Sequence, residues 1–258
     1  MTAAGSTLDL AVLTFEEVRP ILAAGAVALF PVGSTEAHGP HLGLGTDVVI
    51  AQAAALRAAA RFGQQGGAPG VRAALVLPAL GYGVTDFARG FAGTLSVSSA
   101  TVSALVRDVG RAALAAGFRA LVVVNAHLEP AHIAAIRSAV ETLRAEGLRA
   151  AFADNTKKPW ALDLGEEFRS GACHAGEYET SIVMAARPEM VREIVRTALE
   201  DNPRSLSEAI RAGRDSFEAA GGPRAYFGYP ARAGADKGEQ FLDALARGIV
   251  EAAREVVR

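Results

Sequence analysis

Four short apolar runs recur along the chain and are separated by segments long enough for helices. The runs "AVALFPV" and "RALVVVN" are continuous rather than alternating, which is typical of strands buried on both faces of a sheet. Strands that alternate with helices of ten or more residues favour right-handed crossovers and a mainly parallel sheet. The sequence therefore predicts an α/β protein, with strands over residues 26–32, 71–80, 119–125 and 148–154 and helices over 47–62, 98–116 and 130–146.

The remaining segments are less regular. A capping box formed by Thr14 and Glu17 predicts a short helix over 15–24. Residues 219–238 are rich in glycine and proline, and a loop that long in a compact domain usually covers a binding site or an interface. No internal repeat or shift of composition marks a boundary, so we expect a single domain over 1–258. Further helices are predicted near 175–187, near 203–219 and from about 237.

Charge and cysteine content argue against several classes of protein. The formal net charge is −2 at pH 7, so the chain lacks the basic footprint of a nucleic-acid-binding protein. The single cysteine, Cys173, rules out an internal disulfide and fits a reducing cytoplasm. The N-terminus shows no basic segment followed by an apolar core, so we expect no secretory signal. No apolar run approaches the ~20 residues that span a bilayer, so we expect a soluble, cytoplasmic protein with no membrane partner.

Two pairs of potential metal ligands follow predicted strands. Glu36 and His38 come after the first strand, and His127 and Glu129 come after the third. Side chains at i and i+2 of extended backbone lie on the same side, and ligands bind where the carboxyl ends of parallel strands meet. Asp47 stands at the start of the next helix and can fold back over that edge. The sequence therefore predicts that these five side chains converge.

This set has the composition of a site for two divalent metal ions. Two ions carry +4, three carboxylates supply −3, and a bridging hydroxide would balance the charge and act as the nucleophile. Imidazole and carboxylate ligands suit Zn²⁺, Mn²⁺ or Fe²⁺. The alternative is that each Glu-x-His or His-x-Glu pair is only part of a polar surface loop. Of the other histidines, His41 is interpreted as packing the loop or supporting a ligand, and His132 as structural.

A third cluster lies in "ACHAGEYETS", residues 172–181. His174 could carry the proton that activates the leaving group in hydrolysis, with a carboxylate fixing its tautomer. Acidic residues at a helix N-terminus also follow from the helix dipole alone, and we prefer that explanation for Glu177. Cys173 beside His174 suggests a cysteine nucleophile as an alternative. Adjacent residues seldom point the same way, so we interpret Cys173 as a small apolar residue.

The segments around these residues resemble the creatininase (creatinine amidohydrolase) family. "PVGSTEAHGPHLGLGTD" is similar to the family's signature loop, LPxGSxEQHGPHLPLxTD, and "HAGEYETS" is similar to its HAGxxETS motif. "YGVTDFARGFAGTLSV" and "NAHLEP" resemble two further blocks, and the four blocks come in family order from about residue 30 to residue 181. The first and last blocks are highly specific, so the chain is identified as a member of this family.

Membership implies a three-layer α/β/α sandwich, a binuclear centre with two divalent metal ions per chain, and commonly a homohexamer. His174 would be the acid/base residue, and Glu179 would be its nearby carboxylate. The metal ligands that the resemblance implies are Glu36, His38, Asp47 as the bridge, His127 and Glu129.

The implied activity is metal-dependent hydrolysis of a C–N bond in a small or cyclic amide. Family relatives also include a deformylase and a peptidase of biosynthetic pathways, and a catalytically silent binding or assembly subunit is the non-enzymatic alternative. Several residues depart from the family pattern: Gly43 and Ala92 replace prolines, and Phe87 and Ala88 replace a Glu-His pair. The creatininase encloses its flat substrate with tryptophans, whereas Trp160 is the single tryptophan here. These departures argue against creatinine itself as the substrate.

Overall fold

The fold is built on a parallel sheet whose strands follow the predicted apolar runs. The structure is a computed structural model and describes residues 8–258. Within that range the strand order is β2-β1-β3-β4, and every neighbouring pair is parallel. Val32 at the end of one strand lies beside Asn125 at the end of another, so two carboxyl ends meet at the same edge. The strands are β1 (Ala26–Val32), β2 (Ala73–Val76), β3 (Leu121–Asn125) and β4 (Ala150–Phe152).

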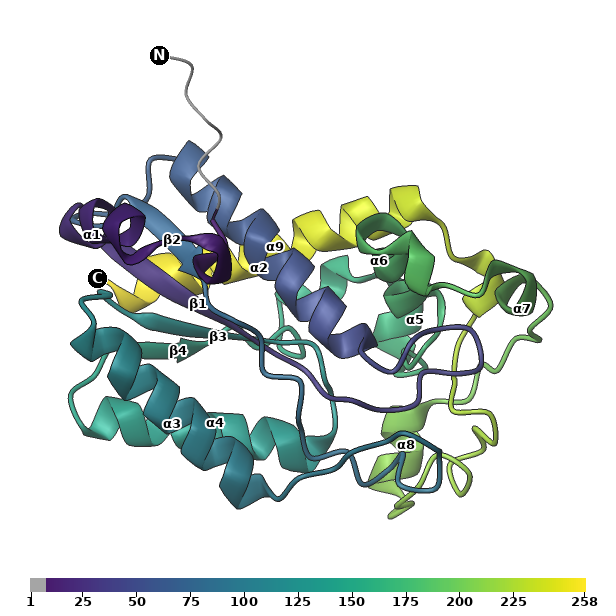
Figure 1. The fold of residues 1–258 in the computed structure, drawn as a ribbon. Helices are drawn as coiled ribbons and strands as arrows, with labels where there is room; N and C mark the ends of the chain where they lie inside the picture. The colour runs from purple at the N-terminus through teal and green to yellow at the C-terminus, as the bar shows by residue number, and fades with distance from the viewer. Residues whose placement is uncertain (1–7) are drawn as a thin grey trace.

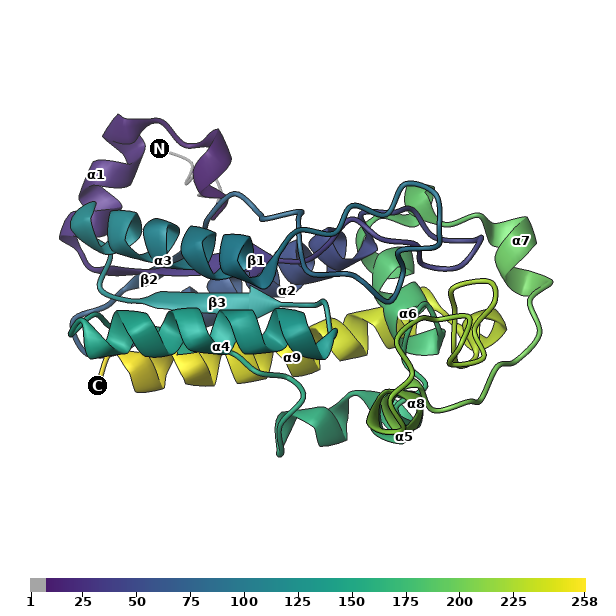
Figure 2. The same cartoon turned by 90° about the horizontal axis from the view of Figure 1, so that it is seen from below.

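Helices cover both faces of the sheet, as the two views in Figure 1 and Figure 2 show. On one face α2 (Thr46–Gln64) packs against α9 (Ala235–Val256). On the other face α3 (Ser99–Ala115) packs against α4 (Pro130–Ala145). This arrangement confirms the predicted three-layer α/β/α sandwich with a mainly parallel central sheet.

The side chains of β1 alternate between the two helical layers. Val27 and Leu29 belong to the apolar cluster that contains α2 and α9, whereas Ala28 and Phe30 belong to the cluster that contains α3 and α4. Every residue of β1 is buried, because neither face of the strand meets water. That double burial is the reason why the strand appears in the sequence as an unbroken apolar run.

The second half of the chain departs further from the predicted elements. The helix predicted over 203–219 is only α8 (Leu206–Arg211), which ends shortly before Gly213, where φ is 79° and the helix cannot continue. The predicted helix near 175–187 is α6 (Glu177–Ala186). The predicted helix over 15–24 is α1 (Phe15–Ala23). Two short helices had no clear periodic signal in the sequence: α5 (Gly165–Ser170) and α7 (Glu193–Thr197). The remaining elements are the 3-10 turns η1 (Leu10–Val12), η2 (Trp160–Asp163), η3 (Pro188–Met190) and η4 (Pro230–Arg232).

Two predictions from the sequence are that the chain has no secretory signal and no membrane-spanning segment. The expected lack of a secretory signal rests partly on residues 1–7, which lie outside the described residues. In residues 8–258, none of the helices combines the length and the apolar character that crossing a bilayer requires.

Candidate metal centre

The predicted ligands meet at the carboxyl edge of the sheet. Glu36 and His38 lie on the loop between β1 and α2, and Asp47 is in the first turn of α2. Gly33 lets the chain return this closely, because a Cβ at that position would lie 2.7 Å from the backbone carbon of Asp47. β3 ends beside β1 and delivers His127 to the same point.

Five side chains form a buried cluster there. His38 Nε2 lies 3.2 Å from Asp47 Oδ1 and 3.6 Å from Glu179 Oε2. His127 Nδ1 lies 3.0 Å from Glu36 Oε1 and 3.1 Å from Asp47 Oδ2. Even the most exposed of the five, His127, is only 4 % exposed. Asp47 therefore directs one carboxylate oxygen toward each of the two imidazoles.

Three imidazoles at the cluster are each oriented by a backbone carbonyl. When one ring nitrogen donates to a carbonyl, the other nitrogen can present its lone pair to a cation, and metal-binding histidines are commonly held in this way. The nitrogens that remain are those that face the carboxylates. The contacts are His127 Nε2 to Val84 O at 2.7 Å, His174 Nε2 to Ala37 O at 3.0 Å, and His38 Nδ1 to Glu36 O at 3.2 Å.

The electrostatics of the cluster favour bound positive charge. Burial lowers the pKa of His38, but the charges of Asp47, Glu179 and Glu36 outweigh burial and raise that pKa to about 10. The pKa of His127 is likewise raised well above its usual value by Glu36 and Asp47, against the effect of burial. Burial raises the pKa of Glu179 to about 8. The carboxylates of Glu36 and Asp47 thus favour protons on the two imidazoles and on Glu179, and divalent cations would supply the same compensation.

Two of the three groups of potential ligands share Asp47. In each group the ligand atoms lie within 4.8 Å of one another. Glu179 occurs in one group, whereas Glu129 occurs in none of those found among the described residues. The structure therefore brings together four of the five ligands expected from the sequence and adds Glu179. The groups are Glu36 with Asp47 and His127, His38 with Asp47 and Glu179, and Glu36 with His38 and His174.

Glu129 lies at the edge of the cluster rather than within it. Its Oε2 accepts the backbone N–H of Phe87 at 3.2 Å, and burial raises the pKa of its carboxyl group. Glu129 and His174 are 9 % and 8 % exposed, which makes them the most accessible of the predicted site residues. Both line a cavity of about 80 Å³ that reaches the cluster, and apolar side chains complete its wall: Phe87, Leu128, Leu206, Ile210 and Phe217.

His174 lies at the wall of this cavity, next to the cluster. Its ring lies on that of Phe217, with the centroids 4.3 Å apart, and its Nδ1 is 4.0 Å from Glu36 Oε1. Burial and the nearby charge of His38 lower the pKa of His174 to about 4. The imidazole is therefore neutral at pH 7 and can accept a proton.

Two hydroxyl groups that the sequence did not single out hold the carboxylates. Ser34 Oγ donates to Asp47 Oδ2 at 2.8 Å, and the Thr85 hydroxyl donates to Glu36 Oε2. Ser34 lies two residues before Glu36, so its position on the loop was an available signal. Thr85 comes from a distant loop and carries no pattern that would connect it with the centre.

The two remaining histidines pack the loops around the centre. His41 is fully buried, and its Nε2 lies 3.0 Å from Thr180 Oγ1, so it joins the β1–α2 loop to α6. His132 on α4 accepts the Val84 N–H through Nδ1 at 3.3 Å, and its Nε2 lies 3.1 Å from Asn125 Oδ1. His132 therefore supports the backbone that orients His127.

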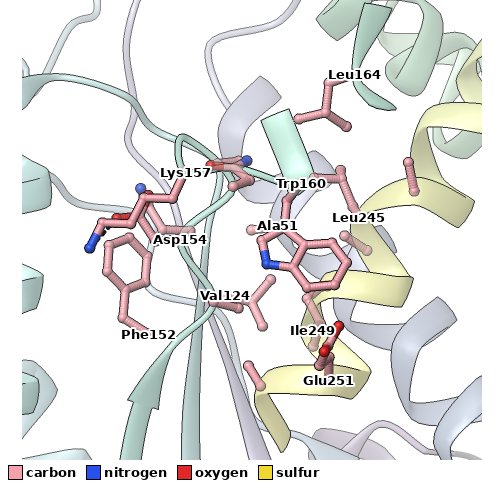
Figure 3. Close-up of a pocket in the computed structure, with 18 of the residues that line it drawn as sticks. Ala51, Val124, Phe152, Asp154, Lys157, Trp160, Leu164, Leu245, Ile249 and Glu251 are labelled. Atoms are coloured by element: carbon pink, nitrogen blue, oxygen red, sulfur yellow. Dashed lines mark ion pairs between the residues drawn. The ribbon is translucent and has the colours of Figure 1, made fainter. Parts of the chain in front are cut away.

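Trp160 does not line the cavity at the cluster. It lies in a separate pocket of about 330 Å³ between the end of the sheet and α9. Figure 3 shows its indole beside Leu245 and Ile249 of α9. The aromatic rings at the cluster are instead those of Phe87 and Phe217. The chain's single tryptophan is thus placed away from the predicted site.

Cys173→Ala should keep the turnover of the wild-type protein. Cys173 lines the cavity, but burial raises the pKa of its thiol well above the usual range, so the nucleophilic thiolate is absent at pH 7. The measurement is kcat of both proteins at matched metal content. A large loss of kcat at full metal content would instead support the cysteine nucleophile.

Comparisons with known proteins agree with this geometry. The creatininase (creatinine amidohydrolase) family profile matches residues 11–253. A mycofactocin precursor peptide peptidase of Mycolicibacterium smegmatis (strain ATCC 700084 / mc(2)155) is 33 % identical over 225 residues, which cover 87 % of this chain and 83 % of the relative. The creatinine amidohydrolase of Pseudomonas putida is 30 % identical over 281 residues, covering 94 % of this chain and 95 % of the relative.

Solved structures extend the likeness to three dimensions. A creatininase structure described with Mn superimposes with a TM-score of 0.72 at 28 % identity and covers 97 % of this chain and 98 % of the other. The match of profile, relatives and fold runs over nearly the whole chain and includes each segment that contributes to the cluster. The chain therefore belongs to the creatininase family, whose named relatives here are hydrolases and peptidases.

Proposed function

We propose that this protein is a metal-dependent hydrolase that cleaves the C–N bond of an amide. The observation that carries the proposal is that two groups of three ligands share Asp47, one through each oxygen. One ion would be held by Glu36, Asp47 and His127, and the other by His38, Asp47 and Glu179. Mixed imidazole and carboxylate donors suit Zn²⁺ or Mn²⁺, and solved relatives are described with Mn and as a Zn-Zn type.

Residues of the chain would transfer the proton and orient the reacting groups. Two bound ions would supply a water of lowered pKa and would polarise the amide carbonyl. His174, neutral and at the cavity wall, takes up a proton and returns it to the departing nitrogen. Glu129, held by the Phe87 N–H, orients the reacting groups from the other side. The apolar wall keeps bulk water out of the cavity and strengthens these charge interactions.

Two substrate classes deserve a direct test. A peptide bond is the first, because a relative named as a peptidase is 33 % identical over 87 % of this chain and because Trp160 lies away from the cavity. A small cyclic amide is the second, because the creatinine amidohydrolase relative aligns over 94 % of the chain. Turnover of short peptides, creatinine, hydantoins and formamides by the metal-loaded protein separates the two. If the metal-loaded protein turned over none of these compounds, that result would contradict the proposed hydrolase.

Removal of metal should abolish turnover. We expect about two ions per chain, since there are two ligand groups, and exhaustive dialysis against a chelator should remove the activity. Zn²⁺ or Mn²⁺ added back should restore it, whereas Mg²⁺ should restore less, because Mg²⁺ prefers oxygen ligands. Elemental analysis with kcat at each step is the measurement. Fewer than one tightly bound ion per chain in the loaded protein would favour the catalytically silent subunit.

The predicted homohexamer and the cytoplasmic location stay predictions. Light scattering of the purified protein measures the first directly.

A further inference from the structure

One buried carboxylate, Glu167, lies outside the predicted site and contacts the segment that carries His174 and Glu179. Glu167 belongs to α5 and is 3 % exposed. Its oxygens accept three backbone N–H groups: those of Glu177 at 2.7 Å, Tyr178 at 2.9 Å and Tyr229 at 2.7 Å.

Two of these donors are the first N–H groups of α6. The residue before this helix is Gly176, which has no side chain to cap it. Unpaired N–H groups at a buried helix start are costly, and a side-chain oxygen near the start usually accepts from them. Glu167 performs this role from a different helix, and burial raises the pKa of its carboxyl group to about 7 against the lowering effect of the three N–H groups. The start of α6 is thereby fixed on α5.

The chain leaves space for this carboxylate by placing glycine at two positions. A Cβ on Gly176 would lie 2.4 Å from Glu167 Oε2, and a Cβ on Gly228 would lie 2.2 Å from the same atom. The Gly228 segment is itself tied to the site, because the Phe227 N–H donates to His174 O at 2.7 Å. Glu167 therefore joins α5, the start of α6 and the 226–229 segment around a single point.

We propose that Glu167 is a positioning residue of the metal centre, which sets the places of Glu179 and His174 by anchoring the first turn of α6. The inference rests on the proposed function, because it takes Glu179 as a ligand. Glu179 lies in that first turn, and its Oε2 accepts the Ala175 N–H at 2.6 Å. A shift of the helix start therefore moves the carboxylate and the adjoining His174 loop together. No contact between Glu167 and a substrate is required.

The test uses Glu167→Gln, with Glu166→Gln as the matched control. Glutamine keeps the size of the side chain but turns an amide NH₂ toward backbone N–H groups, so at least one hydrogen bond is lost. Glu166 is exposed on the same short helix. We expect Glu167→Gln to bind about one ion per chain at metal concentrations that saturate the wild type, and to lose ~10–100-fold in kcat with little change in KM. Glu166→Gln should match the wild type in both.

Metal content separates positioning from a general loss of stability. A Glu167→Gln protein with a lower melting temperature, two ions and wild-type kcat would contradict the positioning role. If Glu167→Gln does not fold, Glu167→Asp provides the test, because it keeps the carboxylate but is one methylene shorter and cannot reach all three N–H groups at once. It should show the same loss of one ion, and two ions with wild-type kcat would overturn the inference. A wild-type protein without tightly bound metal would instead contradict the proposed function.

Discussion

Asp47→Asn should remove both bound ions and lower kcat by at least about a thousandfold. Asp47 is the residue common to the two ligand groups, with Oδ1 near His38 and Oδ2 near His127. Asparagine has nearly the same shape but no charge, and only one of its two terminal atoms can accept from a donor or bind a cation. Each ion would therefore lose either a ligand or the compensating charge. Elemental analysis and steady-state kinetics on the same preparation measure both effects.

Ser34→Ala provides the graded control for this substitution. The Ser34 hydroxyl donates to Asp47 Oδ2, so its removal loosens the carboxylate but leaves both oxygens in place. We expect metal affinity to fall by ~10–100-fold while saturating metal restores two ions and most of the activity. An Asp47→Asn protein that is folded, by circular dichroism, and still binds two ions with useful turnover would contradict the shared-ligand arrangement.

Glu179→Gln should lower the metal content and Glu129→Gln should leave it unchanged, although both substitutions lower turnover. Glu179 lies in a ligand group and 3.6 Å from His38 Nε2, so Glu179→Gln should bind about one ion per chain. Glu129 lies at the cavity wall on the Phe87 N–H, so Glu129→Gln should keep both ions. Because Glu129 would orient the reacting groups, kcat of Glu129→Gln should still fall by ~10²-fold, the loss that a small misplacement of reacting groups can cause.

The two variants decide between the ligand set expected from the sequence and the one favoured by geometry. Metal content is measured at increasing free Zn²⁺, so that weak binding is not mistaken for absence. Loss of an ion from Glu129→Gln, with two ions retained by Glu179→Gln, would favour Glu129 as a ligand. His127→Ala should resemble Glu179→Gln in losing an ion, because His127 completes the other group.

The layered fold could be predicted because its strands are buried on both faces. β1 and β3 are unbroken apolar runs for that physical reason, and their carboxyl ends necessarily meet in a parallel sheet. That rule, together with the position of Asp47 at the start of the next helix, predicted that Glu36, His38, Asp47 and His127 lie together. Short elements such as α5 and α7 could not be predicted in the same way, because five or six residues contain too few turns to show a helical period.

The position of Glu129 could not be predicted from the i, i+2 spacing. The i, i+2 rule assumes that the chain stays extended after β3. Instead, the Asn125 side chain hydrogen-bonds the backbone of His127, and Glu129 is already the cap residue of α4, with Pro130 in its first turn. The chain therefore turns between the two members of the pair, and Glu129 reaches the Phe87 loop. The two-residue spacing of His127 and Glu129 is the same for this turn as for a continued strand.

The role of Glu167 could not be predicted from the sequence, for a different reason. Its three partners are backbone N–H groups, which every non-proline residue has, so no residue type in the sequence marks the contact.

The meeting point of Glu167, Gly176 and Gly228 also restricts how descendants of this chain can diverge. A larger residue at either glycine position would overlap the carboxylate, and an apolar residue at 167 would leave three N–H groups unpaired. Each single change is therefore disfavoured on its own, and a smaller residue at 167 would not make room for a side chain at 176, because a Cβ there would also lie 2.5 Å from Phe227 O. In a lineage of related sequences, these three positions should therefore be inherited as a unit.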